Sequence, residues 1–219
     1  MLRAQAAPGL TADEFYTRAR TRLTLQVPPG VSDPNVTPQR GDHDADPVMQ
    51  KIAEVRPIRP AAVLIPVVDH PEPTILLTQR AQHLPDHPGQ ISFAGGKIDK
   101  TDKDPLDAAL REAEEEIGLA RDHVEPLGYL DVYMTTLGYR IVPVIARVTP
   151  GFALTLNTGE VDNVFEVPLG FLMDQSNVQR HSRDWQGMTR HYYAISFGER
   201  YIWGVTAGIL RNLHDRIYK

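Results

Sequence analysis

Apolar residues in this chain gather in short runs that indicate strands and in a few longer segments with helical spacing. Residues 61–68 indicate a buried strand, residues 69–73 a turn, and residues 74–80 the returning strand. Pro66 inside the first run indicates an edge strand or a bulge. Strands interleaved with two main helices predict an α/β fold, in which an α+β mixed sheet is covered on both faces as an α/β/α sandwich. Further strands are expected at 91–94, 126–133, 140–148 and 191–197, and helices at 105–118 and 204–217.

The first fifty residues have a different pattern. Residues 11–26 predict a surface helix, because Thr11 begins a capping box and Phe15, Ala19 and Leu23 repeat at helical spacing. Residues 28–47 contain five prolines and predict an irregular segment. We therefore expect an N-terminal helix and proline-rich extension over 1–50, with a role in dimerisation or substrate lining left open, and a catalytic domain over 51–219.

Composition excludes several classes of protein and site. The chain has 219 residues, a formal net charge of -5 and no long basic run, which argues against a general nucleic-acid binder. It has no cysteine, which excludes disulfides, thiolate metal sites and cysteine nucleophiles. Neither a signal-peptide segment nor an apolar run of the roughly 18 residues that span a bilayer is present in the sequence. The expectation is a cytoplasmic protein that contacts neither membrane nor nucleic acid.

The helix expected at 105–118 carries the most informative chemistry. Asp104 and Pro105 are typical of a helix start, and Gly118 suits a left-handed C-terminal cap. Three glutamates stand at i, i+3 and i+4, so they share one face and repel one another. Divalent cations that prefer oxygen ligands are the obvious way to offset that repulsion. These glutamates are Glu112, Glu115 and Glu116.

Glutamate-rich helices alone are usually solvated surfaces, so a second feature is needed. The glycine pair at 95–96 lies shortly before the helix and lets the backbone approach a ligand or metal closely. Together, the glycine turn and the glutamates resemble the Nudix box, the signature of a family of pyrophosphohydrolases. The resemblance includes two departures, because Asp102 stands in place of the early glutamate and its spacing to Arg111 is one residue longer. The matching residues are Gly96, Arg111, Glu112, Glu115, Glu116, Gly118 and Leu119.

The flanking sequence is similar to one branch of that family, the coenzyme A pyrophosphatases. That branch has L-L-T-x-R and G-Q before the box, and F-x-G-G-x-x-D-x-x-D leading into it. Here Pro85 stands where the branch often has arginine, which removes one expected phosphate contact, and Ala94 replaces a frequent proline. The corresponding residues are 76–80, 89–93, Gly95, Gly96, Asp99, Asp102, Ala109, 111–113 and 115–118.

The resemblance implies a Nudix-type sandwich and a metal-dependent reaction. It assigns Glu112 and Glu116 as principal ligands of Mg²⁺ or Mn²⁺, with Glu115 and the Gly96 carbonyl as further ligands. Arg111 is expected to orient the carboxylates. The general base is left open between a box glutamate, Glu112 or Glu115, and a residue of a later loop. Glu160 is the distal candidate for ligand or base, and Glu166 is the fallback.

Substrate contacts are expected from Arg80 and from the glycines Gly95 and Gly96, with an exposed strand-end charge as the alternative for Arg80. The implied reaction cleaves coenzyme A or an acyl-CoA to 3′,5′-ADP and 4′-phosphopantetheine or its acyl derivative. Two alternatives stay open: a Nudix hydrolase for ADP-ribose, a dinucleoside polyphosphate or a noncanonical nucleotide, and a catalytically silent Nudix-fold module that binds a ligand. A homodimer is also left open.

Several later residues are open to two interpretations. His83 and His87 lack a third nitrogen or sulfur ligand nearby, so loop positions are favoured over a zinc site. A basic stretch late in the chain is expected to be a solvated loop, with binding of a coenzyme A 3′-phosphate as the alternative; its residues are His181, Arg183, Arg190 and His191. The aromatic residues Tyr192, Tyr193 and Trp203 are expected in the core, with base stacking as the alternative.

Overall fold

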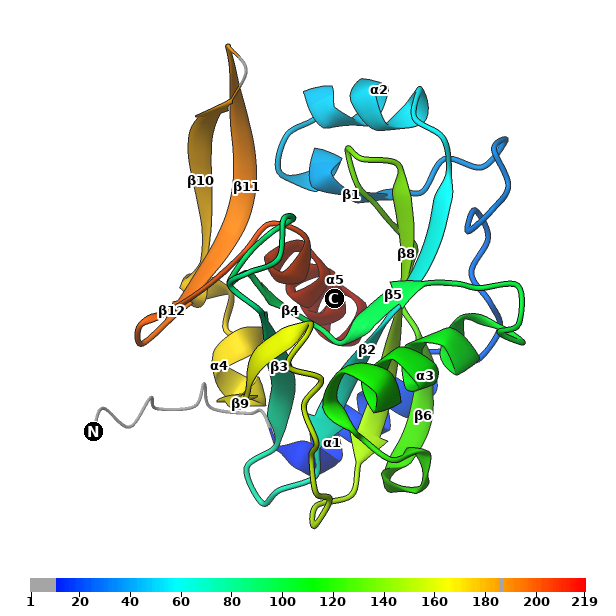
Figure 1. The fold of residues 1–219 in the computed structure, drawn as a ribbon, viewed down its shortest axis with the longest axis vertical. Helices are drawn as coiled ribbons and strands as arrows, with labels where there is room; N and C mark the ends of the chain where they lie inside the picture. Colours follow the sequence, from blue (N-terminus) through cyan, green and yellow to red (C-terminus); the bar gives the residue numbers. More distant parts are fainter. Residues whose placement is uncertain (1–10, 186) are drawn as a thin grey trace.

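The computed structural model describes residues 11–185 and 187–219, and within them it forms a nine-stranded mixed sheet and a separate three-stranded sheet (Figure 1). The large sheet has the order β1-β7-β8-β2-β3-β4, with β5 also beside β2, β6 beside β8 and β9 beside β3. Its strands are β1 (Arg40–Gly41), β2 (Arg59–Val68), β3 (Thr74–Arg80), β4 (Ile91–Ser92), β5 (Gly95–Lys97), β6 (Val124–Tyr129), β7 (Tyr133–Met134), β8 (Tyr139–Val148) and β9 (Val161–Pro168). The small sheet contains β10 (Val178–Trp185), β11 (Met188–Phe197) and β12 (Arg200–Trp203). The helices are α1 (Ala12–Arg22), α2 (Val48–Glu54), α3 (Pro105–Ile117), α4 (Leu169–Met173) and α5 (Val205–Tyr218), with short 3₁₀ turns at Asp42–Asp44, Arg121–His123 and Gln175–Asn177.

Strand β2 lies inside the large sheet, so the expectation that Pro66 marks an edge strand or a bulge was wrong. Along its whole length β2 pairs in parallel with β8, and on its other side it pairs with β5 at 61–63 and with β3 at 67–68. The Leu64 N–H donates toward that second side, to the Ala94 carbonyl at 2.9 Å. Because N–H groups alternate along a strand, Pro66 faces the same side, in the gap between β5 and β3. Its missing N–H therefore breaks no ladder bond.

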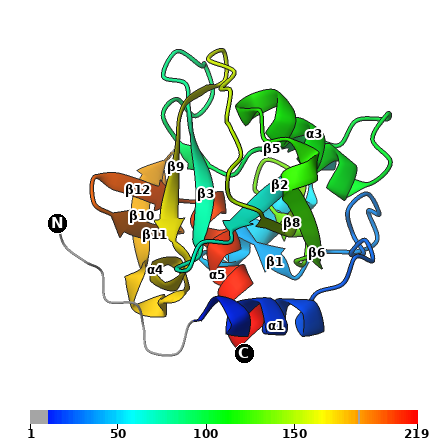
Figure 2. The ribbon, with the colours of Figure 1, turned by 90° about the horizontal axis from the view of Figure 1, so that it is seen from below.

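Helices cover both faces of the large sheet, which confirms the α/β/α sandwich (Figure 2). Successive residues of β2 point to opposite faces of the sheet. Leu64 belongs to the core between the sheet and α3, and Ile65 belongs to the core that includes α1 and α5. Helix α1 is shorter than expected, but its predicted apolar stripe is buried, with Phe15 and Ala19 at 0 % exposure. The helix predicted to lie on the surface therefore contributes to the main core.

The segment between α1 and α2 is largely irregular, as its prolines predict, and side chains of the sheet hold it. The buried Arg140 guanidinium donates to the carbonyls of Gly30, Asp33 and Val36 at 2.5, 2.6 and 3.0 Å. Asp42 accepts hydrogen bonds from the Thr136 N–H at 2.8 Å and from the Tyr133 hydroxyl. These contacts attach the extension to β7 and β8, while the domain boundary at residue 50 stays a prediction.

Strands with an apolar run were predicted, and strands without one were missed. The run expected at 126–133 is divided into β6 and β7, and the one expected at 91–94 yields only the short β4. Strands β1, β5, β9, β10 and β12 were not expected; β10 in particular is mostly polar. Strand β5 contains the glycine pair, which was expected to form a turn. Among the described helices, none has the length and apolar character that crossing a bilayer requires.

Candidate active site

Helix α3 begins and ends where its sequence predicts, which fixes the direction in which its glutamates point. The Asp104 side chain accepts from the Asp107 N–H at 2.9 Å and Pro105 is the first helical residue. At the other end Gly118 adopts φ 69°, and a Cβ there would lie 2.8 Å from the Thr155 nitrogen, so glycine is required. Because Ala113 and Ile117 are buried against the sheet, the helix cannot rotate its acidic face away.

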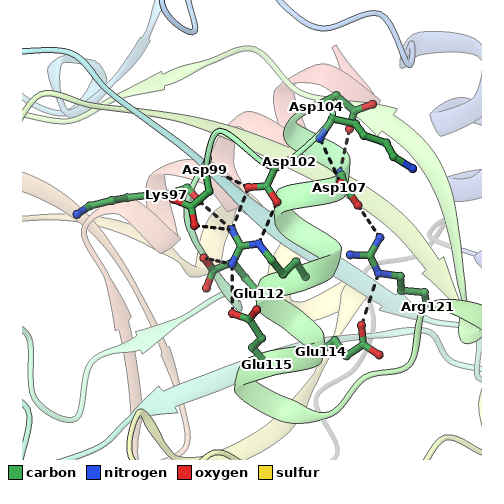
Figure 3. A network of polar contacts seen from close by, with 11 residues as sticks. Lys97, Asp99, Asp102, Asp104, Asp107, Glu112, Glu114, Glu115 and Arg121 are labelled. Carbon is green, nitrogen blue, oxygen red and sulfur yellow. Dashed lines mark hydrogen bonds and ion pairs between the residues drawn. The ribbon is translucent and has the colours of Figure 1, made fainter.

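Arg111 is the centre of the polar network on this helix, and Figure 3 shows its partners Asp102, Glu112 and Glu115. Its guanidinium donates to both carboxylate oxygens of Asp102, at 2.9 and 3.0 Å, and this contact holds the pKa of Asp102 below its usual value. Single contacts reach Glu112 at 2.9 Å and Glu115 at 3.2 Å. The bidentate contact of Arg111 is thus made to Asp102 and not to a box glutamate. Asp102 therefore positions Arg111, a role that sequence reasoning missed.

Glu116 is the most buried of the three box glutamates, with 6 % exposure. Burial is the main cause that raises its pKa to about 8, followed by the charges of Glu112 and Glu160. The Gly95 backbone N–H hydrogen-bonds to it and opposes that shift. Burial likewise raises the pKa of Glu112, which is less deeply buried. A buried carboxylate beside two others favours a bound cation.

Gly96 faces Glu112 at very short range. A Cβ at this position would lie 2.5 Å from the Glu112 Oε1 atom, so a side chain would displace the carboxylate. The glycine pair therefore does what its sequence suggests: Gly95 donates to one glutamate, and Gly96 leaves space for another.

The structure brings two further expected residues to this group. Arg80 and Glu160 both act on the pKa of Glu116, Arg80 by lowering it and Glu160 by raising it. Within the described residues, the buried Nε of Arg80 has no hydrogen-bond partner. Glu160 is held by the Asn157 side-chain amide at 3.1 Å, and its own carbonyl accepts from the Ala81 N–H at 2.8 Å.

The fallback Glu166 lies elsewhere. It is on β9 opposite Leu76, toward the end of the pairing at which Thr74 meets Pro168, whereas Arg80 meets Val161 at the other end. Its carboxylate is engaged by His70 at 3.0 Å and by the Thr74 hydroxyl. The structure therefore does not bring Glu166 to the glutamates of α3.

As placed in the structure, the carboxylates do not form a closed cation cage. Among residues 11–185 and 187–219, no three His, Cys, Asp or Glu side chains are grouped in a way that could hold a metal ion. The side chain of Glu115 is 58 % exposed and forms an ion pair with Arg111. Arg111 also forms an ion pair with Glu112 Oε1. Even so, the donor chemistry fits a divalent ion with oxygen ligands, because Glu112, Glu116 and Glu160 influence one another and Gly96 leaves room beside them.

The remaining candidates lie outside this group. His83 and His87 are exposed in the loop between β3 and β4. The basic stretch is part of the β10–β11 hairpin and not a loop, with Arg183 directly opposite Arg190. Tyr192 and Trp203 are only half-buried, so their expected place in the core was wrong; only Tyr193 packs against the core.

The family follows from sequence comparison. Residues 58–186 match the model of the NUDIX domain. The chain belongs to the Nudix family. Proteins from Yersinia pestis and Yersinia pseudotuberculosis, each described as an uncharacterized Nudix hydrolase NudL, are 38 % identical to it over 159 residues, covering 73 % of this chain and 80 % of each relative. This Nudix protein is therefore a hydrolase of a pyrophosphate linkage, in a family that generally uses divalent metal ions.

Solved structures of Nudix proteins show a weaker likeness. A Deinococcus radiodurans protein matches with a TM-score of 0.46 and 12 % identity, over 73 % of this Nudix hydrolase and 82 % of that chain. The NUDIX domain of Shewanella oneidensis NrtR, in a structure complexed with ADP ribose, matches with a TM-score of 0.39 and 20 % identity, over 52 % of this chain and 75 % of that one.

Proposed function

We propose that this Nudix hydrolase cleaves the diphosphate of coenzyme A or an acyl-CoA, releasing 3′,5′-ADP and 4′-phosphopantetheine or its acyl derivative. The proposal rests on the contacts between two motif segments outside the Nudix box, the one ending at Arg80 and the one beginning at Gly89. The Arg80 N–H donates to the Gln90 carbonyl at 3.0 Å, and the Gly89 N–H donates to the Arg80 carbonyl at 3.1 Å. The L-L-T-x-R and G-Q segments are therefore one structural unit, and the charge of its Arg80 acts on Glu116.

The metal ion in this proposal is Mg²⁺ or Mn²⁺, with Glu112, Glu116, Glu115 and the Gly96 carbonyl as its ligands. When bound, such an ion neutralises diphosphate charge and lowers the pKa of water. Arg111, fixed by Asp102, orients Glu112 and Glu115.

Two residues outside the box complete the proposed site. Glu160 takes the proton of the attacking water, for which its exposed position near Glu112 and Glu116 is suited. Arg80 contacts a phosphate through the side chain whose Nε has no protein partner within the described residues.

The test is a panel of coenzyme A, acetyl-CoA, ADP-ribose and a dinucleoside polyphosphate, each with Mg²⁺ or Mn²⁺, with products separated by chromatography. We expect coenzyme A or acetyl-CoA to have the highest kcat/KM and to yield 3′,5′-ADP. Faster turnover of ADP-ribose with none of coenzyme A would overturn the substrate assignment. Binding without any hydrolysis would instead indicate a silent ligand-binding module. The cytoplasmic location and a homodimer stay predictions.

A further inference from the structure

A cavity of about 720 Å³ lies between the end of β3 and the small sheet. Strand β12 contacts β4 beside it, and Figure 1 shows the small sheet on the β4 side of the large one. Its volume is in the range of sites that hold a small organic ligand. The residues that matter for its chemistry are Gln79, Gly89, Ile91, Asn163, Tyr201 and Trp203.

One wall of this cavity is aromatic because of the strand register. Trp203 pairs with Ala194, and Tyr201 pairs with Ser196, so both share a face of the small sheet with Tyr192. The rings of Tyr192 and Trp203 are 5.5 Å apart. The opposite face carries Ile195 and Ile202 into the core. The aromatic face is therefore not needed for the core: Trp203 is half-buried and Tyr201 is 38 % exposed.

The other wall is polar and lies at the end of β3 that carries Arg80. Gln79 and Asn163 are a cross-strand pair on β3 and β9, and within the described residues neither side-chain amide has a hydrogen-bond partner. Gln79 directly precedes Arg80, whose charge acts on Glu116, so the two side chains leave opposite faces of β3 at the same strand end. Gly89, which also lines the cavity, donates to the Arg80 carbonyl. A ligand whose phosphates reach Arg80 would therefore extend around the end of β3 to enter the cavity.

We propose that this cavity receives the nucleobase of the substrate, with Trp203 stacking on the base and the amides of Gln79 and Asn163 hydrogen-bonding to its edge. The inference rests on the proposed function only in that the substrate carries a nucleoside diphosphate. A flat heterocycle fits this lining because aromatic rings offer a stacking face, and amides offer both donors and acceptors. The charged residues of the lining are one acid and one base, Glu199 and Arg200, so the cavity has no excess charge that would favour a phosphate.

The test compares Trp203→Ala and Trp203→Phe with the wild type and with Tyr139→Ala, which removes a half-buried aromatic ring from β8. For Trp203→Ala we expect KM for coenzyme A and Ki for 3′,5′-ADP to rise about tenfold or more, with kcat little changed, because stacking binds ground and transition states alike. The Ki for 4′-phosphopantetheine should stay the same. Trp203→Phe should recover much of the loss, and Tyr139→Ala should show none.

Gln79→Ala provides a second variant that leaves the aromatic wall intact, and it should also raise the Ki for 3′,5′-ADP. A binding measurement is independent of turnover. Tryptophan fluorescence of the wild type, titrated with 3′,5′-ADP in EDTA, should be quenched, and Trp203→Phe, which keeps only Trp185, should lose that quenching.

The outcomes separate the two proposals. The nucleobase site alone is overturned if the wild type hydrolyses coenzyme A and Trp203→Ala leaves KM and Ki unchanged. A larger rise in the Ki for 4′-phosphopantetheine than for 3′,5′-ADP also overturns it, because the cavity would then hold the other end of the substrate. A wild type that leaves coenzyme A intact overturns the proposed function, and nucleotide quenching of Trp203 still decides the cavity.

Discussion

Replacing Glu116 with glutamine should separate activity from stability. The substitution keeps the shape of the side chain and removes one charge from a carboxylate that is 6 % exposed and close to Glu112 and Glu160. If Glu116 binds the catalytic metal, kcat should fall by at least about 10²-fold. In the absence of metal, the same change should make the folded protein more stable, because the buried Glu116 must either carry a costly charge or take up a proton, and glutamine requires neither.

The size of that gain follows from the pKa of Glu116, which burial raises from 4.5 to about 8. The folded state binds more protons than the unfolded state between these two values, so stability falls as the pH rises through that window. At pH 7 the shift corresponds to at most about 3 kcal/mol, at 1.36 kcal/mol per pH unit. For a chain of this size, 1 kcal/mol moves Tm by roughly 2–4 °C. Glu116→Gln should therefore raise Tm by several degrees in EDTA at pH 7 and by less at pH 5.

The assay is thermal and urea unfolding in EDTA at several pH values, repeated with Mg²⁺, alongside kinetics. Glu114→Gln is the matched control, because Glu114 is on the same helix but its side chain is 56 % exposed. Mg²⁺ should stabilise the wild type and the control but not Glu116→Gln. A Glu116→Gln variant that keeps full activity, or one that Mg²⁺ stabilises as strongly as the wild type, would refute the metal assignment.

Three further predictions test the surroundings of the site and the core. Gly96→Ala places a Cβ 2.5 Å from Glu112 Oε1, so kcat should fall at least about tenfold with an unchanged circular dichroism spectrum; wild-type turnover would contradict the need for close approach. Asp102→Asn should destabilise the protein at pH 7, and because the folded-state pKa of Asp102 is lowered, the difference from wild type should shrink as the pH falls below about 4. A difference in urea unfolding that does not vary with pH would mean that the Asp102 charge is irrelevant. Phe15→Ala should cost about 3–5 kcal/mol in urea unfolding, since Phe15 is fully buried; a loss below about 1 kcal/mol would show that α1 is not part of the core.

Helix α3 was predictable almost to the residue because its signals are local. The Asp104–Pro105 start, the apolar stripe and Gly118 each act within one turn of the chain. Strands such as β8 were predictable because they are apolar on both faces. Strand β10 was not, because it is mostly polar and is defined as a strand by pairing with β11. Pro66 was misjudged for a related reason: its effect depends on where the neighbouring strands stop.

The candidate site likewise has a part that could be predicted from local sequence and a part that could not. The box predicted that Glu112 and Glu116 share a helix face and that Arg111 lies beside them. The contact between Arg111 and Asp102 could not be predicted, because Asp102 reaches Arg111 only when the loop before α3 folds back. A signal for Asp102 existed in its place within the box, but it suggested a substitute glutamate. The half-buried position of Trp203 depends on the register of a sheet that the sequence did not reveal.

Arg140 makes an irregular segment part of one cooperative unit. Its guanidinium, 7 % exposed, serves three carbonyls between Gly30 and Val36. All three contacts are made by Nη1, so detaching the whole segment would leave a buried charge short of partners, which couples the opening of the segment to β8. The Val36 amide, which donates to the Asp33 carbonyl, should then exchange hydrogen more slowly than the exposed amides of residues 32 and 33. A chain shortened to begin at residue 51 would keep the family domain but would remove all three carbonyls that the Arg140 guanidinium contacts.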